Sequence, residues 1–358
     1  MNKKVVVFLG LCLIACMASL MEDAYSKPFI RGIVEGWSGN GETITINGGN
    51  FGTKKPATPV IWDNLDSGEP SSNWTQVENT IEIYSGSGQL NHSRYCFRFD
   101  KSKDSGFTIQ KNIEITDKLY LFVKRRYDYD VRPDNHKFFS IWQPGFKNSI
   151  LWNYNWGNSY QMRNSHCAPN IDPLQREPNY VIKLGSKNFP AVGQWQTEEF
   201  FVQVESGIRR YDGVMGYRLN NIQHRSWAAN RAMFCEEYNQ LLSNVFVDNY
   251  SDHLRNNPKP NDFIWVDDVY IDTSWARVML GNKPNYDACT DIEIQVPVKW
   301  SSNFITITLN RGALSPCNTY YLYVFDENGN VNTDGFPVYI VTSSGEKPCP
   351  PKGLKISE

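Results

Sequence analysis

The sequence predicts an almost entirely β-structured protein with one large β-sandwich and one small one. Short runs rich in branched and aromatic residues recur at 119–123, 138–142, 200–204 and 263–271, and clusters of Gly, Pro, Asn and Asp separate them. Short strands with regularly spaced turn signals are typical of sandwiches and jelly rolls. Helical periodicity is scarce, and only Trp227 to Leu242 has the pattern of a helix of a few turns.

Composition narrows the classes of function. The chain has 358 residues, which is enough for two domains. Aromatic residues make up 14% of it, including 11 Trp and 19 Tyr, and its formal net charge is only −2. A nucleic-acid binder usually has a clustered basic face, whereas the basic runs at 124–126 and 209–210 are short and are interpreted as solvated surface. We therefore expect no nucleic-acid partner and a protein that uses the faces of aromatic rings.

The first 26 residues have the three-part pattern of a secretory signal. Asn2-Lys3-Lys4 is positive, residues 5–16 are apolar, and small residues follow. The apolar run is too short to span a bilayer comfortably as a helix. Residues 13–16 resemble a bacterial lipobox, which would make Cys16 a lipidated first residue, whereas Ala24-Tyr25-Ser26 suits an ordinary signal peptidase. Both alternatives predict export, as an outer-membrane lipoprotein with a lipid anchor or as a periplasmic or extracellular protein.

Six cysteines follow the signal and would meet an oxidising compartment. They allow 15 complete pairings, and their spacing matches neither CxxC nor a Cys/His zinc pattern. The preferred single pairing is Cys289 with Cys317, because both flank strand-like segments in one small region. The alternative is that these cysteines are buried thiols.

Segments near both ends of the chain predict a small, split sandwich. Thr43 to Asn47 alternates as a strand does, a glycine-rich turn follows it, and 36–52 resembles the opening of an IPT/TIG module, which is immunoglobulin-like. Further alternating runs lie at 293–297, 305–309 and 321–324, before a turn signal. The predicted organisation is a signal at 1–26, first module strands at 27–56, a large sandwich at 57–280, the rest of the module at 281–345 and a Pro-rich tail at 346–358.

The large sandwich begins and ends in related motifs. Residues 62–68, with sequence WDNLDSG, and 265–272, with sequence WVDDVYID, resemble the first and last strands of concanavalin A-like and carbohydrate-binding-module jelly rolls. That resemblance implies an all-β jelly roll and a structural Ca²⁺ between Asp66 and Asp268, since hard cations take oxygen ligands. The alternative is that these aspartates cap turns in solvent.

One aromatic strand suggests a ligand. In residues 150–156, Trp152, Tyr154 and Trp156 alternate with amides, so a strand would project the three rings from one face about 7 Å apart. Such rings can stack on the apolar faces of sugars, and Asn153 could bond hydroxyl groups. The alternative is that the rings belong to the core, where large aromatics bury most area.

Hydrolysis of a glycan by paired carboxylates is disfavoured. A retaining glycosidase needs two carboxylates about 5 Å apart, and jelly-roll glucanases usually carry them as E-x-D-x-x-E on one strand, a pattern absent from this sequence. Glu198 and Glu199 are adjacent and should therefore point to opposite faces of a strand.

A polysaccharide lyase remains the alternative to simple glycan binding. β-Elimination needs a group that neutralises a uronate carboxylate and a proton-transferring pair. The sequence departs from the R-x-E-x-R, Q-I-H and Y-x-K-x-G motifs of alginate-lyase jelly rolls, and it offers only Arg163, His166, Gln143 and Tyr217 as candidates. The main prediction is an exported polysaccharide-binding or cell-surface protein, and a uronate-specific lyase is the second.

Overall fold

The structure is a computed structural model. It describes residues 27–34, 41–78, 81–86, 93–100, 109–132, 134–144, 149–155, 159–165, 182–183, 191–207, 210, 212–221, 224–231, 241–251, 253, 256 and 259–341, with only the backbone described at 149–155, 159–165, 182–183, 224, 226, 228, 230, 231, 249 and 250. The predicted signal and Pro-rich tail lie outside these ranges. No helix within them is long and apolar enough to cross a membrane.

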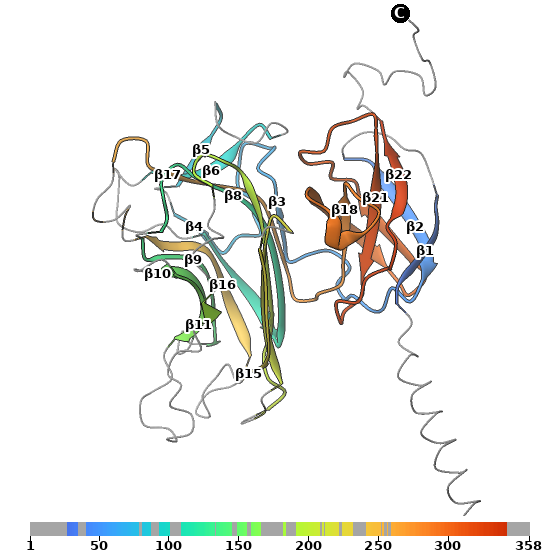
Figure 1. Cartoon of the computed structure of the whole chain (residues 1–358), viewed down its shortest axis with the longest axis horizontal. Coiled ribbons are helices and arrows are strands. Elements are labelled where there is room, and N and C mark those ends of the chain that lie inside the picture. Colours follow the sequence, from blue (N-terminus) through green and yellow to red (C-terminus); the bar gives the residue numbers. More distant parts are fainter. Residues whose placement is uncertain are drawn as a thin grey trace, which may run out of the picture.

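The described chain is almost all β-structure, which confirms the predicted fold class. A jelly-roll sandwich of two sheets stands beside a smaller β-sandwich (Figure 1). We call the two sheets of the jelly roll the near sheet and the far sheet, according to their position relative to the small sandwich. Every pairing between named strands is antiparallel.

The near sheet has the order β15-β14-β13-β8-β17-β6-β5, and β3 also pairs with β17. Its strands are β3 (Ile61–Asp63), β5 (Ile81–Tyr84), β6 (Cys96–Asp100), β8 (Lys118–Tyr127), β13 (Gln196–Gln203), β14 (Gly213–Leu219), β15 (His224–Arg231) and β17 (Phe263–Asp272). Because β3 and β17 carry the opening and closing motifs, the expected meeting of first and last strands is confirmed, with Trp62 opposite Tyr270.

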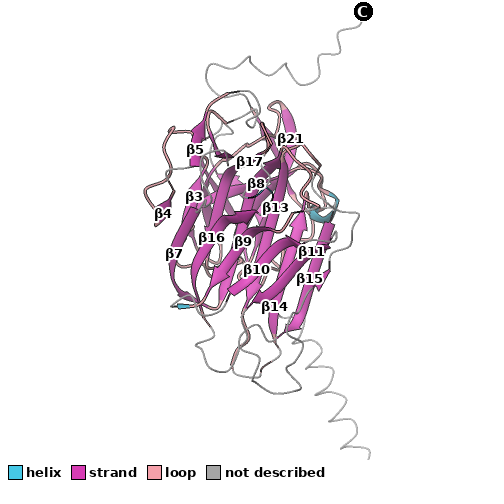
Figure 2. Ribbon diagram, turned by 90° about the vertical axis from the view of Figure 1, so that its left-hand side faces the viewer, coloured by secondary structure: helices cyan, strands magenta, loops and turns pink. Residues whose placement is uncertain are grey.

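The far sheet has the order β12-β11-β10-β9-β16-β7-β4, and Figure 2 looks onto it. Its strands are β4 (Gln76–Val77), β7 (Ile109–Thr116), β9 (His136–Trp142), β10 (Ser149–Asn155), β11 (Ser159–Ser165), β12 (Ile182–Lys183) and β16 (Leu242–Ser251).

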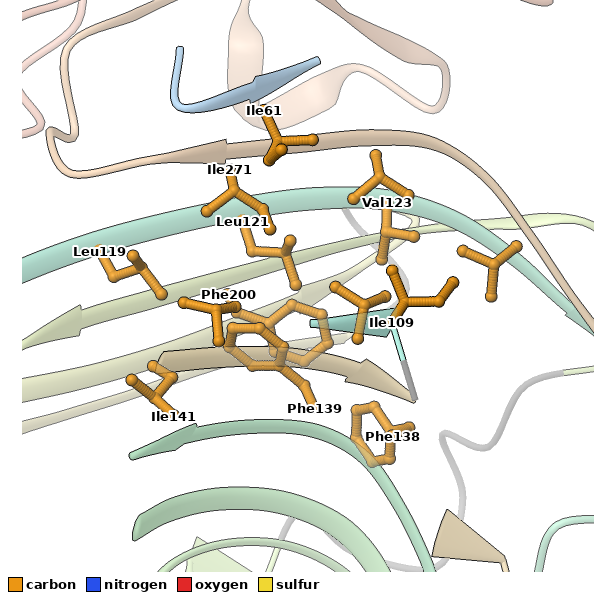
Figure 3. Close-up of a cluster of buried hydrophobic side chains, with 14 of the residues drawn as sticks. Ile61, Ile109, Leu119, Leu121, Val123, Phe138, Phe139, Ile141, Phe200 and Ile271 are labelled. Atoms are coloured by element: carbon orange, nitrogen blue, oxygen red, sulfur yellow. The ribbon is translucent and has the colours of Figure 1, made fainter. Parts of the chain in front are cut away.

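An apolar core joins the near and far sheets (Figure 3). Alternate residues of each strand form this core. Leu119, Leu121 and Val123 of β8 face inward, and the ring centroids of Phe139 and Phe200, from opposite sheets, lie 4.8 Å apart. Each such side chain contributes roughly 1.5–3 kcal/mol when fully buried.

The small sandwich joins strands from both ends of the chain. Its order is β1-β2-β20-β19-β18-β21-β22. Ile44 lies opposite Ile307 where β2 pairs with β20, so the two predicted segments do meet. Its elements are β1 (Phe29–Val34), β2 (Thr43–Gly49), β18 (Arg277–Gly281), the short 3₁₀ helix η3 (Tyr286–Ala288), β19 (Ile292–Trp300), β20 (Phe304–Thr308), β21 (Asn318–Phe325) and β22 (Phe336–Ile340).

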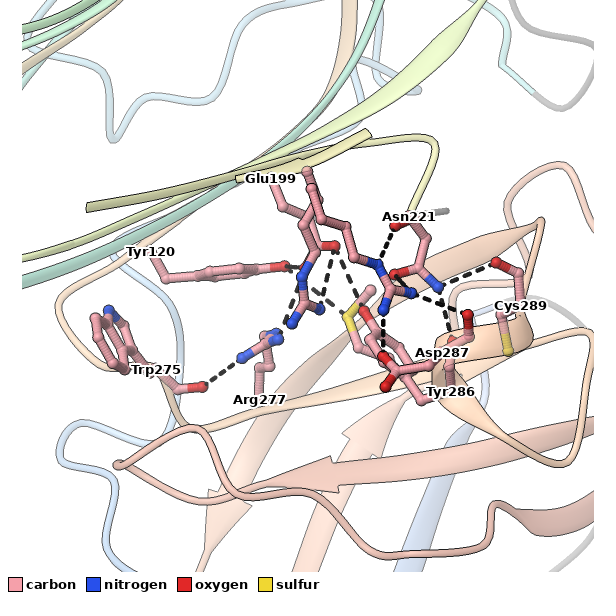
Figure 4. Close-up of polar contacts among 11 residues, drawn as sticks. Tyr120, Glu199, Asn221, Trp275, Arg277, Tyr286, Asp287 and Cys289 are labelled. Atoms are coloured by element: carbon pink, nitrogen blue, oxygen red, sulfur yellow. Dashed lines mark hydrogen bonds and ion pairs between the residues drawn. The ribbon is translucent and has the colours of Figure 1, made fainter. Parts of the chain in front are cut away.

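The small sandwich packs on the outer face of the near sheet. Tyr120, Phe201 and Tyr270 form one buried cluster with residues of the small sandwich such as Met279 and Tyr323. Polar contacts cross the same interface (Figure 4). The outer face of the near sheet is therefore largely covered, and the outer face of the far sheet points the other way (Figure 1).

The basic run at 124–126 is not solvated surface, so that interpretation was wrong. Lys124 and Arg125 occupy opposite faces of β8, and both side chains are buried, while Arg126 is half-buried. Lys124 Nζ lies 3.0 Å from Glu293 Oε1 of the small sandwich, and Arg125 is fully buried between the two sheets of the jelly roll. Alternation along a strand that is covered on both sides explains the difference.

Two further expectations were wrong. The expected helix is absent at both described ends: Trp227 to Arg231 belongs to β15 and Leu242 begins β16, while 232–240 lie outside the described residues. Pairing with β14 overrides the local helical pattern. Cys289 is a free, buried thiol and so is Cys96, whereas Cys317 is disulfide-bonded. Cys289 Sγ instead donates to the carbonyl oxygen of Lys283 at 3.5 Å, so Cys289 is not the partner of Cys317.

Candidate functional site

The outer face of the far sheet is the face of the jelly roll that the small sandwich leaves uncovered. Directly opposite residues of an antiparallel pair share a face, and successive residues alternate. Phe139 and Ile141 of β9 and Val245 and Val247 of β16 are core residues. The positions between them, such as Ser140, therefore belong to the outer face.

Strand register arranges these outer positions into three rows that cross the sheet. The first row runs through Asn112, Asn244, Trp142, Ser149 and Ser165, the second through Gln76, Gln110, Phe246, Ser140, Leu151 and Arg163, and the third through Tyr250, Lys137, Asn153, Gln161 and Lys183.

The three rows contain no acidic residue. They contain six amides, three aromatic residues and three cations, and no carboxylate. Asn112 is exposed, and Trp142, Phe246 and Lys137 are half-buried. Gln110 Nε2 donates to Asn112 Oδ1 at 2.7 Å, which holds two neighbouring amides in a fixed arrangement. Among the side chains that the structure describes, Gln76 and Asn112 offer exposed amides, Trp142 and Phe246 offer half-buried rings, and Lys137 offers a positive charge, whereas Ser140, Gln110 and Asn244 are buried.

The predicted aromatic strand is β10, for which the backbone alone is described. Trp152 lies opposite the core residue Phe139, and Asn153 lies opposite Lys137 after a register shift. This register puts position 152 on the core side of the sheet and position 153 on the outer side, which favours the core alternative for Trp152. The aromatic platform of Trp152, Tyr154 and Trp156 therefore stays a prediction. Trp156 itself lies outside the described residues.

The lyase candidates that the structure describes lie in different places. Position 163 of β11 lies in the second row, opposite Leu151, and His166 lies outside the described residues. Gln143 is buried directly after β9. Tyr217 is a core residue of β14 in the near sheet, with its ring centroid 5.1 Å from that of Phe200.

A buried ionic cluster between the sheets was not predicted. Arg125 Nε donates to Asp248 Oδ2 at 3.0 Å and Arg125 also pairs with Glu198, while His136 Nε2 lies 2.6 Å from Asp248 Oδ1. All four side chains are fully buried. Burial raises the pKa of Glu198 to about 7, against the opposing influence of Arg125. Because the cluster has no access to solvent, it fixes the two sheets relative to each other.

The two aspartates predicted to bind calcium belong to a third polar region. Asp268 sits at a register shift of β17 with φ of 48°, and its N–H donates to Asp267 Oδ1 at 2.8 Å. Burial, followed by the nearby charges of Asp268 and Asp66, raises the pKa of Asp267. No three His, Cys, Asp or Glu side chains of the described residues form a metal-binding group, so carbonyl oxygens would have to complete any site.

By its fold, the protein belongs to the all-β jelly-roll class. No known family model matches the chain, and no curated protein matches it. Among solved structures, the alginate lyase Aly36B has a TM-score of 0.41 at 13% identity, covering 60% of this chain and 98% of that one. A PL-14 alginate lyase from Aplysia kurodai also gives 0.41 at 13%, covering 60% and 99%. The alginate lyase vAL-1 from Chlorella virus gives 0.39 at 15%, covering 60% and 99%.

Proposed function

We propose that this chain is an exported polysaccharide-binding protein whose binding face is the outer face of the far sheet. The observation that carries the proposal is the composition of the three rows, which combine amides, aromatic residues and cations without a carboxylate. Amides match sugar hydroxyls, rings match the apolar faces of sugars, and a flat sheet face accommodates an extended polymer. Three cations favour an anionic glycan, such as one that contains uronate.

Affinity electrophoresis with an anionic and a neutral polysaccharide tests this proposal. The expected result is that alginate retards the protein more than a neutral β-glucan does. Arg163→Ala and Lys137→Ala should each weaken the retardation about two- to fivefold, the effect of one exposed charge contact. Lys299→Ala removes an exposed cation from the small sandwich and serves as the control. Equal loss in all three variants would refute binding at this face.

A polysaccharide lyase is the second candidate, because the second row contains Arg163, a cation that could neutralise a uronate carboxylate. Two of the other candidates cannot reach this face, because Tyr217 is buried in the core and Gln143 is also buried. The base would have to be another residue. Incubation with alginate distinguishes the two functions, since β-elimination generates the ultraviolet absorbance of an unsaturated uronate and binding alone does not.

A structural Ca²⁺ between Asp66 and Asp268 is a further part of the proposal. Its support is the neighbouring Asp267, whose pKa is raised by burial and then by the charges of Asp268 and Asp66, since a cation would neutralise these charges. EDTA should lower the Tm of the wild-type protein, and Ca²⁺ should restore it. An unchanged Tm, with no calcium found by elemental analysis, would exclude the ion.

Export, with the IPT/TIG-like module next to the jelly roll, completes the proposal. A lipid at Cys16 would anchor the protein to the outer membrane. Labelling cells with radioactive palmitate tests this: incorporation that disappears in Cys16→Ser supports the anchor, and absence of label supports the ordinary signal peptidase.

A further inference from the structure

The near sheet has one exposed tryptophan at the edge of its interface with the small sandwich. Trp227 of β15 is 53% exposed, and it is the exposed tryptophan among those whose side chains the structure describes. Its ring centroid lies 5.6 Å from that of Trp275 and 5.8 Å from that of Phe201. Trp275 is buried and donates its indole N–H to the carbonyl oxygens of Leu119 and Val202, so the support for Trp227 is itself fixed.

A glycine on the neighbouring strand leaves space for this indole. Gly216 of β14 lies directly opposite Trp227, and a Cβ on Gly216 would come within 2.6 Å of Trp227 Cε3. The benzo ring therefore fills the space above Gly216 where a side chain would otherwise stand. Glycine inside a strand lowers stability relative to alanine, and it often marks a close approach. The chain bears that cost at the position that lets the indole lean over the neighbouring strand.

The surrounding side chains limit the movement of the ring. Arg225, two residues before Trp227 on the same face of β15, is held by Asp287 Oδ1 and by the carbonyl oxygen of Asn221. Trp227 is thus bordered by rings and by an anchored arginine, and more than half of it faces solvent. A fixed aromatic surface loses little conformational entropy when a ligand stacks on it.

We propose that Trp227 is the stacking platform of a second saccharide site, which binds the apolar face of a pyranose ring. This inference rests on the proposed polysaccharide binding but places a separate site on the opposite side of the jelly roll from the three rows. Stacking needs no charge, so binding at Trp227 should persist in 1 M salt, where the Debye length is about 3 Å and contacts to exposed cations are screened.

Hydroxyl-radical footprinting of the wild-type protein tests the site without any substitution. Alginate oligosaccharides and cello-oligosaccharides are the probes, and oxidation of Trp227 and Trp142 is followed by peptide mass spectrometry. Protection of Trp227 supports the inference. Protection of Trp142 alone refutes it and leaves the far-sheet proposal standing. Protection of Trp227 alone supports the second site and contradicts the far-sheet face, and protection of neither contradicts both.

Variants then separate recognition from stability. In 1 M salt, Trp227→Ala should weaken binding about three- to tenfold, the scale of one aromatic contact, and Trp227→Tyr should restore part of it. Gly216→Ala keeps the indole but forces it out of this space, so it should also weaken binding. Phe304→Ala removes an exposed ring from the small sandwich and is the control. If Trp227→Ala binds like Phe304→Ala while circular dichroism shows both folded, the site is refuted.

Discussion

Glu198 and Glu199 are neighbours in β13, but they have different surroundings. Glu198 lies inside the jelly roll with Arg125, and Glu199 accepts a hydrogen bond from Tyr120 at 2.8 Å in the interface between the sandwiches. Both are almost completely buried. Alternation along one strand thus gives each carboxylate a separate structural task, and neither is available to a substrate.

Removal of the Glu198 charge should change how stability depends on pH. The pKa of Glu198 is raised from 4.5 to about 7 in the folded protein, so the folded state holds this proton more tightly than the unfolded chain does. The contribution of Glu198 to the free energy of unfolding is therefore full below about pH 4.5 and is lost as pH rises through about 7. The loss is ~3 kcal/mol, since each unit of pKa shift corresponds to about 1.4 kcal/mol. Glu198→Gln should lack this decline in urea unfolding at pH 5 to 8.

The matched control is Glu69→Gln, which removes an exposed carboxyl from a loop. Its unfolding free energy should follow that of the wild-type protein across the pH range. Parallel curves for Glu198→Gln and the wild-type protein would contradict the prediction, because the difference between them isolates the titration of Glu198.

At the scale of elements, a buried ion pair holds the segments that connect the two sandwiches. Lys54 follows β2 and pairs with Asp272 at the end of β17, and Tyr270 also donates to Asp272 Oδ2, at 2.8 Å. Burial lowers the pKa of Lys54 and raises that of Asp272. Both directions mean that desolvation opposes the charges, so each charge depends on its partner.

Breaking this pair on one side should be costly. Lys54→Met leaves the Asp272 carboxylate buried without its cation, and the expected loss in the free energy of unfolding is about 3–5 kcal/mol. Lys54→Met combined with Asp272→Asn removes both charges and keeps an acceptor for Tyr270, so it should recover more than half of that loss. Denaturant unfolding of the double-mutant cycle measures both values, and strictly additive losses would be evidence against the coupling.

Local sequence was enough to predict several strands but not what covers their faces. The strands at 119–123, 138–142 and 263–271 were predictable because local alternation and turn residues determine them. The burial of Lys124 and Arg125 was not, since it depends on what covers each face of β8. The three rows were also beyond prediction, because register shifts such as the one between Trp152 and Asn153 decide which positions align.

The aromatic residue that the sequence analysis overlooked is Trp227. Its local sequence favoured a helix. The prediction therefore missed the strand in which Trp227 lies opposite Gly216. A glycine directly opposite a tryptophan becomes visible only when two strands are aligned. The signal that could have suggested the pairing was the run at 213–219, where Gly216 interrupts an otherwise bulky strand.

At the scale of the molecule, the interface between the sandwiches makes them one unit. Arg277 of β18 lies 3.7 Å from Glu199 and packs over the rings of Tyr120 and Phe325. Asn221 donates to the carbonyl oxygens of Tyr286 and Cys289 at 2.8 and 3.0 Å. A large apolar interface with buried polar contacts opposes relative motion of two domains. The small sandwich therefore orients the far sheet rigidly and does not act as a flexible spacer.

Cooperative unfolding follows from this arrangement. The wild-type protein should unfold in one transition, with equal calorimetric and van't Hoff enthalpies, because separating the sandwiches would expose the cluster around Tyr120 and Tyr323. Glu199→Ala leaves Arg277 buried without a carboxylate, so it should lower the Tm and split or broaden the transition. Asp212→Ala, which removes an exposed carboxylate from the connection between β13 and β14, should do neither. Two separate transitions in the wild-type protein would mean that the interface does not couple the sandwiches.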